Sequence, residues 1–431
     1  MTTHPYRRRT VRSAIGALVA AALLGAATAV PATADPAGPA AAPSQATTET
    51  VPPPHEDPFY DLPPHLDRKR DGTVLRWRAL PADALAVPAP ARVWQLLYKT
   101  RDNAGHATAT AGTLLVPVGR PAGGASTRPL VSYQTPEDGL STSCAPSYLL
   151  RAGATGPAGT LAQARFDGEQ VAAAVRRGWA VMVPDYEGPA SEFLGAGAAA
   201  HGVLDGIRAA RSFRNAHVGR RAPVTMWGYS GGGFATAAAA QLQRRYAPEL
   251  RISGVAVGGV PADLNAVLRS VSGQPYSGWI PFGLAALRNT YPDADIDQYL
   301  NASARAYADD VAHDCAGEAV ISGPAFADLD QFEARPGSLT RGAFHEFAHD
   351  VSPVGIGGTP TAPVYMYHGT ADELLPISGA RELAAQYRSR GADVVLTEHE
   401  GQNHGSEQEY GVAGAVAFLE QQLVLPGRTA D

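Results

Sequence analysis

A glycine-flanked serine, in the segment Gly228-Tyr229-Ser230-Gly231-Gly232, is the feature of this sequence that most constrains its fold. An apolar segment at 224–227 precedes it, and a run of small residues with helical character follows at 231–246. A change from strand to helix within so few residues requires a sharp turn, which glycine tolerates best. The segment matches the nucleophile elbow pattern, in which the turn presents a serine at the carboxyl end of a strand.

The segments around this turn alternate between strand and helix patterns. Short apolar runs predict strands at 93–98, 107–116, 129–133, 179–183, 224–227, 252–257, 364–367 and 394–397. Helical patterns predict helices at 169–177, 198–213, 231–246, 380–388 and 413–422. Such alternation is typical of a mainly parallel central sheet with helices on both faces. Together with the serine turn, it predicts the α/β-hydrolase fold.

The interval from residue 261 to 358 interrupts the alternation. Because a structureless loop of that length does not suit a compact domain, we expect an inserted helical cap, or lid. Short helical patterns occur at 262–271 and 297–310, and an apolar stretch between them includes Trp279 and Phe282. We interpret these two large side chains as candidates for an apolar pocket above the serine.

The amino-terminal segment has the features of an export signal. Residues 7–12 contain four arginines, an apolar stretch follows from 14 to 30, and Ala32-Thr33-Ala34 fits a cleavage site. The apolar stretch is short and consists mostly of alanine and glycine, which favours a signal peptide over a membrane anchor. In an exported protein, the two cysteines, Cys144 and Cys315, are expected to form a disulfide.

These patterns predict five parts of the chain. They are a signal peptide at 1–34, a disordered leader rich in proline and alanine at 35–55, a first part of the hydrolase domain at 56–260, the cap at 261–358, and a second part of the domain at 359–425. The net charge of −6 gives no electrostatic footprint for nucleic acid. No later apolar run is long enough to span a membrane, so we expect no stable membrane anchor after signal cleavage.

A serine hydroxyl needs a general base and an acid to become a nucleophile, and in this fold both follow the serine in the chain. Asp372 comes directly after the strand predicted at 364–367, and we favour it over Glu373 as the acid. His404 lies in a glycine-flanked loop before the last helix. We favour it over His399, which lies closer to the end of its strand, because the loop can reach over the serine.

Two further strand ends carry acidic residues. The segment 133–139 follows an early central strand, where this fold supplies a second donor to the oxyanion hole. The segment Asp185-Tyr186-Glu187 ends another strand, and we interpret it as a support for the site through hydrogen bonds. No metal or cofactor is needed for this chemistry.

Together these motifs resemble the secretory lipase family of the yeast lipase A type, a branch of the α/β-hydrolases with a large helical cap. The similarity covers about residues 60–425, and its matching elements are Gly-Tyr-Ser-Gly-Gly at 228–232, His-Gly-Thr-Ala-Asp at 368–372, Asn-His-Gly at 403–405, Tyr-Gln-Thr-Pro-Glu-Asp at 133–138, Cys-Ala-Pro-Ser-Tyr at 144–148 and Asp-Tyr-Glu-Gly-Pro at 185–189. The fungal relatives carry a second disulfide near the carboxyl end, which this chain lacks.

The resemblance implies a secreted hydrolase of carboxylic esters, often triacylglycerols, that works without a metal or cofactor. It implies an oxyanion hole formed by Gly231 and Asp138, and the cap residues Trp279 and Phe282 then suggest an acyl pocket. The expected partners are an ester substrate and a lipid interface. Rival interpretations are a secreted serine peptidase or acyltransferase of the same fold, and a non-catalytic binding module.

Overall fold

The computed structural model describes residues 50–81, 83–119, 127–219 and 222–423. The predicted signal peptide and the leader up to residue 49 lie outside these residues. The final leader residues, 50–55, belong instead to the folded chain. Val51 is buried beside Tyr148 and Leu149, and its N–H donates to the carbonyl of Gly153. The folded part therefore begins before the boundary predicted at residue 56.

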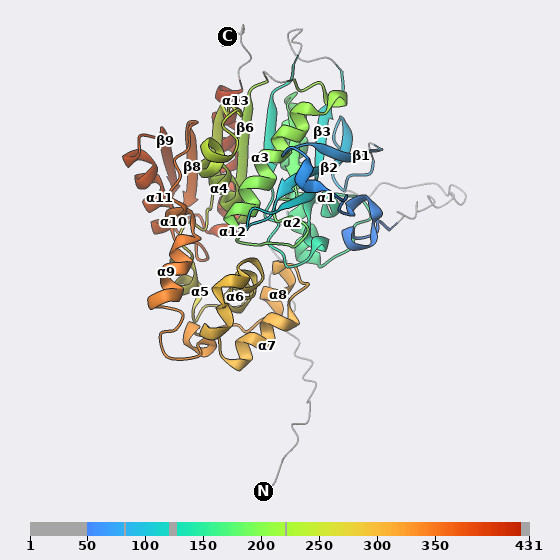
Figure 1. Cartoon of the computed structure of the whole chain (residues 1–431). Coiled ribbons are helices and arrows are strands. Elements are labelled where there is room, and N and C mark those ends of the chain that lie inside the picture. The colour runs from blue at the N-terminus through green and yellow to red at the C-terminus, as the bar shows by residue number, and fades with distance from the viewer. Residues whose placement is uncertain (1–49, 82, 120–126, 220–221, 424–431) are drawn as a thin grey trace, which may run out of the picture. The chain divides into compact units, whose positions relative to one another are not determined.

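Within the described residues, nine strands form one twisted sheet, in the order β1-β2-β3-β5-β4-β6-β7-β8-β9 (Figure 1). The first three neighbouring pairs are antiparallel and the remaining five are parallel. The bounds are β1 Val74–Leu80, β2 Ala91–Arg101, β3 Ala107–Pro117, β4 Leu130–Gln134, β5 Ala180–Pro184, β6 Val224–Tyr229, β7 Gly254–Gly258, β8 Val364–Gly369 and β9 Val394–His399. Sequence reasoning missed β1, whose side chains are only partly buried and lack a clear apolar pattern.

Alternate residues along the buried strands face two different helical layers. On β6, Met226 packs with the layer of α3, α4 and α11, whereas its neighbour Trp227 packs with the layer of α2 and α13. This alternation follows from the two-residue period of a strand, and it explains why the central strands are buried on both faces. The helices of the two layers are α2 Ala158–Arg176, α3 Ala196–Ser212, α4 Gly231–Tyr246, α11 Ile377–Ser389 and α13 Val412–Gln422. Two short helices, α1 Pro146–Leu149 and α12 His404–Tyr410, complete the hydrolase part of the described chain.

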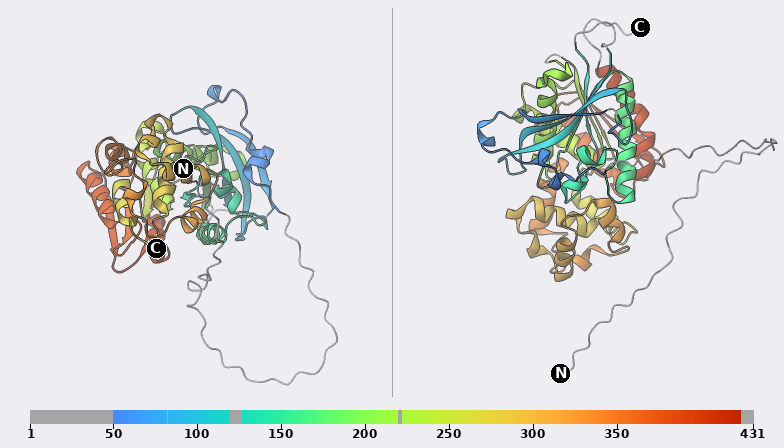
Figure 2. Two further views of the ribbon diagram at one scale, coloured as in Figure 1. Left: turned by 90° about the horizontal axis from the view of Figure 1, so that it is seen from below. Right: turned by 90° about the vertical axis from the view of Figure 1, so that its right-hand side faces the viewer.

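A purely helical segment connects β7 to β8 in the described chain and lies at one end of the sheet (Figure 2). Its helices are α5 Leu264–Val271, α6 Trp279–Thr290, α7 Ala302–Asp310, α8 Ala316–Ser322, α9 Gly342–Asp350 and α10 Pro353–Ile356. These helices bury an apolar core of their own, which includes Leu268, Phe282 and Phe344. The helix expected at 297–310 is divided, because Asn301 caps α7 by accepting the N–H of Ala304.

Candidate active site

Ser230 occupies the turn between β6 and α4. Its backbone has φ 56°, a conformation that non-glycine residues seldom adopt, and its N–H donates to the carbonyl of Gly258. A Cβ on Gly228 would lie 2.1 Å from the carbonyl oxygen of Gly232, so a side chain at residue 228 is excluded. Neighbouring strand and helix thus hold a strained serine in place, which is the geometry of a nucleophile elbow.

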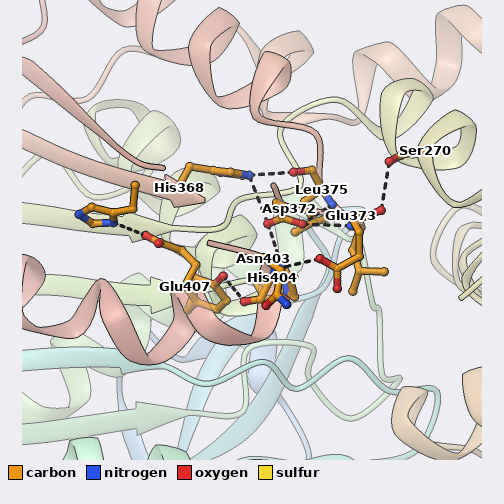
Figure 3. Close-up of polar contacts among 12 residues, drawn as sticks. Ser270, His368, Asp372, Glu373, Leu375, Asn403, His404 and Glu407 are labelled. Atoms are coloured by element: carbon orange, nitrogen blue, oxygen red, sulfur yellow. Dashed lines mark hydrogen bonds and ion pairs between the residues drawn. The ribbon is translucent and has the colours of Figure 1, made fainter. Parts of the chain in front are cut away.

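The structure brings Ser230, His404 and Asp372 into one hydrogen-bonded series. His404 Nε2 lies 3.0 Å from Ser230 Oγ. His404 Nδ1 lies 2.8 Å from Asp372 Oδ2, and Figure 3 shows these two side chains side by side. Because Nδ1 faces a carboxylate, it carries the proton, which leaves Nε2 free to accept the serine O–H. The three side chains come from three loops that are more than 30 residues apart in sequence.

Asp372 is held by several donors besides His404. Its Oδ1 accepts the N–H groups of Leu374 and Leu375, at 3.1 and 2.8 Å. His368 Nε2 lies 3.3 Å from its Oδ2 and also donates to the carbonyl of Leu375 (Figure 3). Burial alone would raise the pKa of Asp372, but hydrogen bonds from His368 and His404, and attraction to these rings when they are protonated, lower it well below its ordinary value. The carboxyl is therefore ionised wherever the protein is folded near neutral pH.

His404 is the first residue of α12, a short helix that sequence reasoning missed. Its N–H donates to Glu373 Oε2 at 3.1 Å, and its carbonyl accepts the hydroxyl of Tyr229 at 2.6 Å. Asn403 caps the helix through a reciprocal pair of hydrogen bonds with Ser406. Glu373, the alternative acid, therefore contacts the backbone of the histidine rather than its ring, and Tyr229 adds a contact that its place in the elbow did not predict.

His399, the alternative base, lies at the end of β9 and contacts a different acid. Its Nδ1 is 2.7 Å from Oε1 of Glu407, which is fully buried on α12. This pair ties the strand end to the helix that begins with His404. His399 thus braces the histidine loop, and only His404 reaches Ser230.

Asp138 lies against the start of α4. A Cβ on Gly231 would be only 1.7 Å from Asp138 Oδ1, so the absence of a side chain at residue 231 admits the carboxyl group there. Within the described chain, this Oδ1 is shielded from solvent and has no hydrogen-bond partner. Burial raises the pKa of Asp138 to about 7, although attraction to His404 in its protonated form opposes the shift. The loop itself is strained, because Asp138 has φ 40°.

Three more carboxyl groups are buried behind Asp138. Glu187 Oε2 accepts the N–H of Gly139, and Glu137 Oε2 accepts the N–H of Glu187, each at 3.2 Å. Asp185 accepts both the N–H and the hydroxyl of Ser147. Burial is the main cause that raises the pKa of all three groups. These contacts join the loop after β4 to the loop after β5, which agrees with the supporting role expected for residues 185–187.

An apolar cavity of about 350 Å³ opens beside Ser230. Its wall includes Gly231, Asp138 and His404, together with side chains from the helical segment. Trp279 lines the cavity, as expected, but Phe282 does not. Three residues further along α6, the ring of Phe282 points into the core of the helical segment, where it packs on Phe193 and Trp279.

A disulfide joins Cys144 to Cys315, as the sequence predicted. Cys144 follows the Asp138 loop, and Cys315 lies directly before α8. Backbone hydrogen bonds reinforce the link, since the N–H of Ala316 donates to the carbonyl of Asp138 at 2.9 Å. The loop that carries Asp138 is therefore anchored to the helical segment.

Residues 50–423, apart from the few that are not described, hold no cluster of histidine, cysteine and acidic side chains suited to a metal ion. The same residues contain no helix that is both long and apolar enough to cross a membrane.

Comparisons with known proteins agree with this architecture. A family model described as secretory lipase matches residues 157–425. Lipase A of Arthroderma benhamiae is 35% identical over 386 residues, which cover 86% of this chain and 80% of that protein. A secreted triacylglycerol lipase of Malassezia globosa is 31% identical over 355 residues, or 80% of this chain and 76% of that protein. A solved structure of Candida antarctica lipase A is 25% identical with a TM-score of 0.78, covers 89% of this chain and 88% of its own, and confirms the predicted fold.

Proposed function

The chain belongs to the secretory lipase family and is a serine hydrolase of the lipase and esterase type, and we propose that it cleaves lipid esters through Ser230, His404 and Asp372. The observation that carries this proposal is the hydrogen-bonded series from Asp372 through His404 to Ser230 at the wall of an apolar cavity. Acyl transfer to serine requires an acid that orients a base, and a base that activates the nucleophile, and this series supplies all three.

The first half of the reaction acylates the serine. His404 Nε2 takes the proton of Ser230 Oγ while Oγ attacks the ester carbonyl carbon. The tetrahedral intermediate then expels the alcohol, whose oxygen receives the proton from Nε2. Asp372 stabilises the imidazolium that exists between these two proton transfers, and its four donors keep it ionised for that purpose.

The second half releases the acid. A water molecule loses a proton to His404 Nε2 and attacks the acyl carbonyl carbon, and Ser230 Oγ leaves with the proton from Nε2. Tyr229 and Glu373 hold the backbone on both sides of the His404 Cα, so the ring keeps its position through both steps.

We assign the oxyanion hole to the N–H of Gly231 and the side chain of Asp138. The N–H of Gly231 is at the start of α4, where helix N–H groups have no partner within the helix. The backbone N–H of Asp138 instead helps to lower the pKa of two carboxyl groups, those of Glu187 and of Asp138 itself, against the raising effect of burial. A protonated Asp138 carboxyl, by contrast, has an unpartnered Oδ1 beside Gly231 and can donate to the oxyanion.

The surface of the helical segment favours a lipid as the substrate. Tyr276, Ile321 and Phe326 are large apolar side chains exposed on its surface, and Ile321 also lines the cavity. We propose that this surface meets the lipid interface from which the ester enters. We also retain the proposal that residues 1–34 direct secretion, since the family is described as secretory.

The test is hydrolysis of p-nitrophenyl esters by purified Ser230→Ala protein. We expect kcat/KM to fall by roughly 10⁴–10⁶-fold, because the nucleophile is lost. Ser212→Ala is the matched control, since its hydroxyl donates to the carbonyl of Ala209 and Ser212 does not line the cavity. Wild-type turnover by a folded Ser230→Ala protein, or failure of the wild-type serine to react with a fluorophosphonate, would contradict the proposal.

A further inference from the structure

One wall of the cavity is polar, and it comes from a helix that the reaction does not use. Thr160, Gln163 and Asp167 on α2 all line the cavity. Their spacing of three and four residues places them on the same face of the helix. The other polar lining residues belong to the loop after β4, to the elbow or to α12: Thr135, Glu137, Asp138, Ser230, His404 and Gln408.

Asp167 lies on the face of α2 that packs against the sheet. One turn further along, the same face buries Val171 in the apolar core, so an apolar residue would suit position 167. Asp167 is only 1% exposed, and a buried carboxyl group costs free energy unless its hydrogen bonds are made. Its Oδ1 accepts the hydroxyl of Tyr133 at 2.7 Å, and its Oδ2 accepts Nε2 of Gln163 at 3.0 Å.

The hydrogen bond from Gln163 to Asp167 fixes the orientation of the Gln163 amide group. Gln163 is partly exposed, whereas Asp167 is hidden behind it. An amide offers two N–H donors and one carbonyl acceptor, and the contact with Asp167 uses one donor. One turn earlier on α2, Thr160 Oγ1 has no hydrogen-bond partner among the described residues. This wall therefore has the capacity to bind a polar group.

The wall that α5 and α6 form differs in kind. The residues that α5 and α6 contribute to the cavity are aliphatic or aromatic, apart from one glycine: Leu264, Val267, Leu268, Val271, Trp279, Gly283 and Leu287. A hydrocarbon chain gains by lying there, because that surface leaves water. A hydroxyl group on the same substrate would lose its hydrogen bonds to water at that wall, and it would regain them at α2.

We propose that Gln163, oriented by Asp167 and assisted by Thr160, is a subsite for a free hydroxyl group carried by the ester substrate. The amide of Gln163 exchanges hydrogen bonds with the hydroxyl group, while the apolar wall holds the hydrocarbon part. The inference rests on the proposed function and deepens it, since it names hydroxylated esters as the preferred class. Burial raises the pKa of Asp167 to about 7, so at acidic and neutral pH its carboxyl group does not bring a full negative charge to the cavity.

The hydroxyl group can belong to the alcohol or to the acid of the ester, and matched substrates separate the two. One pair is glycerol 1-monobutyrate and propyl butyrate, which differ only in the hydroxyl groups of the alcohol. The other pair is methyl 6-hydroxyhexanoate and methyl hexanoate. We expect the wild type to prefer the hydroxylated ester in one of these pairs by about 5-fold in kcat/KM, which corresponds to one net hydrogen bond.

The variants Gln163→Leu and Thr160→Val test the residues. Each should reduce that preference, Gln163→Leu to nearly one, while kcat/KM for the ester without the hydroxyl stays within about 2-fold of wild type. Gln170→Leu is the control, because Gln170 is on α2 but does not line the cavity. An equal rate for both members of each pair in the wild type, or an unchanged preference in Gln163→Leu, would overturn the inference. Absence of hydrolysis of all four esters would instead contradict the proposed function, and the subsite with it.

Discussion

The loops at the carboxyl ends of the strands and the helical segment between β7 and β8 meet at one cavity, but they hold their side chains differently. On the loops, hydrogen bonds fix individual atoms, as the four donors around Asp372 do. On the helical segment, Leu268 and Leu287 are held by apolar packing. Hydrogen bonds determine the position of reacting groups, whereas packing determines the shape of a surface. We therefore expect the loops to control the rate and the helical segment to control selectivity.

The largest effect is expected when the covalent link between the two regions is removed. The double variant Cys144→Ser/Cys315→Ser removes the disulfide that joins the Asp138 loop to the helical segment, across 171 positions of sequence. We expect the free energy of unfolding to fall by about 2–5 kcal/mol, because a long loop in the unfolded chain is no longer closed. Urea denaturation measures this change.

Wild-type protein treated with a reductant is the control for the substitutions themselves, and it should unfold with the same midpoint as the double variant. An unchanged midpoint in both samples would mean that the backbone hydrogen bonds between these segments, such as that from Leu140 to Asp314, suffice without the disulfide.

The contribution of the loops at the carboxyl ends of the strands is tested at Asp138. Loss of its carboxyl in Asp138→Ala should lower kcat/KM by about 10²–10³-fold, the effect of removing one oxyanion donor, and Asp138→Asn should lose less. The wild-type rate should also fall as the pH rises through about 7, because the carboxyl donates only while protonated and the carboxylate repels the oxyanion. Asp138→Asn keeps its donor at every pH and should lack this alkaline decline.

Rate profiles from pH 5 to 9 on a short-chain ester measure both effects. Far-UV circular dichroism over the same pH range is the control: a constant signal shows that the alkaline decline in rate is not caused by unfolding. If Asp138→Asn loses as much activity as Asp138→Ala while remaining folded, the negative charge itself is needed and the donor assignment is wrong.

The contribution of the helical segment is tested at two neighbouring positions of α6. Gly283 lines the cavity, and a Cβ there would have nothing within 4 Å, so Gly283→Leu should fill part of the cavity. We expect kcat/KM for octanoate esters to fall by about 10-fold relative to acetate esters, because several methylene groups lose their place. Phe282→Leu should leave this ratio unchanged and cost about 1 kcal/mol of stability, since Phe282 packs in the core.

An acyl-length series from acetate to decanoate, run on both variants, distinguishes a residue that lines the cavity from a residue in the core of the helical segment. A shifted profile in Phe282→Leu with an unchanged profile in Gly283→Leu would reverse the assignment. The same series also tests the original expectation that Phe282 belongs to the pocket.

Much of the fold could be predicted because its signals are local. The strand and helix periods, and the glycines around Ser230, act over a few residues, so the mainly parallel sheet followed from the sequence. The signals for β1 and α12 were weaker. The strand β1 is an edge strand with only partly buried side chains, and α12 is a seven-residue helix rich in polar side chains.

Only part of the candidate site could be predicted, because the signals in a sequence are local whereas the site joins distant segments. The order serine, acid, histidine pointed to Ser230, Asp372 and His404, and these side chains meet in the structure. The contribution of His368 was not recognised, although its position four residues before Asp372 at a strand end was a usable signal. Nothing in the sequence around Gln163 indicated that α2 faces the cavity.

By itself, then, the sequence determined the elements and the position of the serine, since backbone sterics and hydrophobic periodicity operate between near neighbours. Tertiary structure alone decided that His399 pairs with Glu407 and that Phe282 points into the core rather than the cavity. It also decided that the carboxyl group of Asp138 lies beside Gly231. Each of these outcomes depends on which loops the strand order brings together and on how the helices rotate when they pack, and both are properties of contacts between residues far apart in the chain.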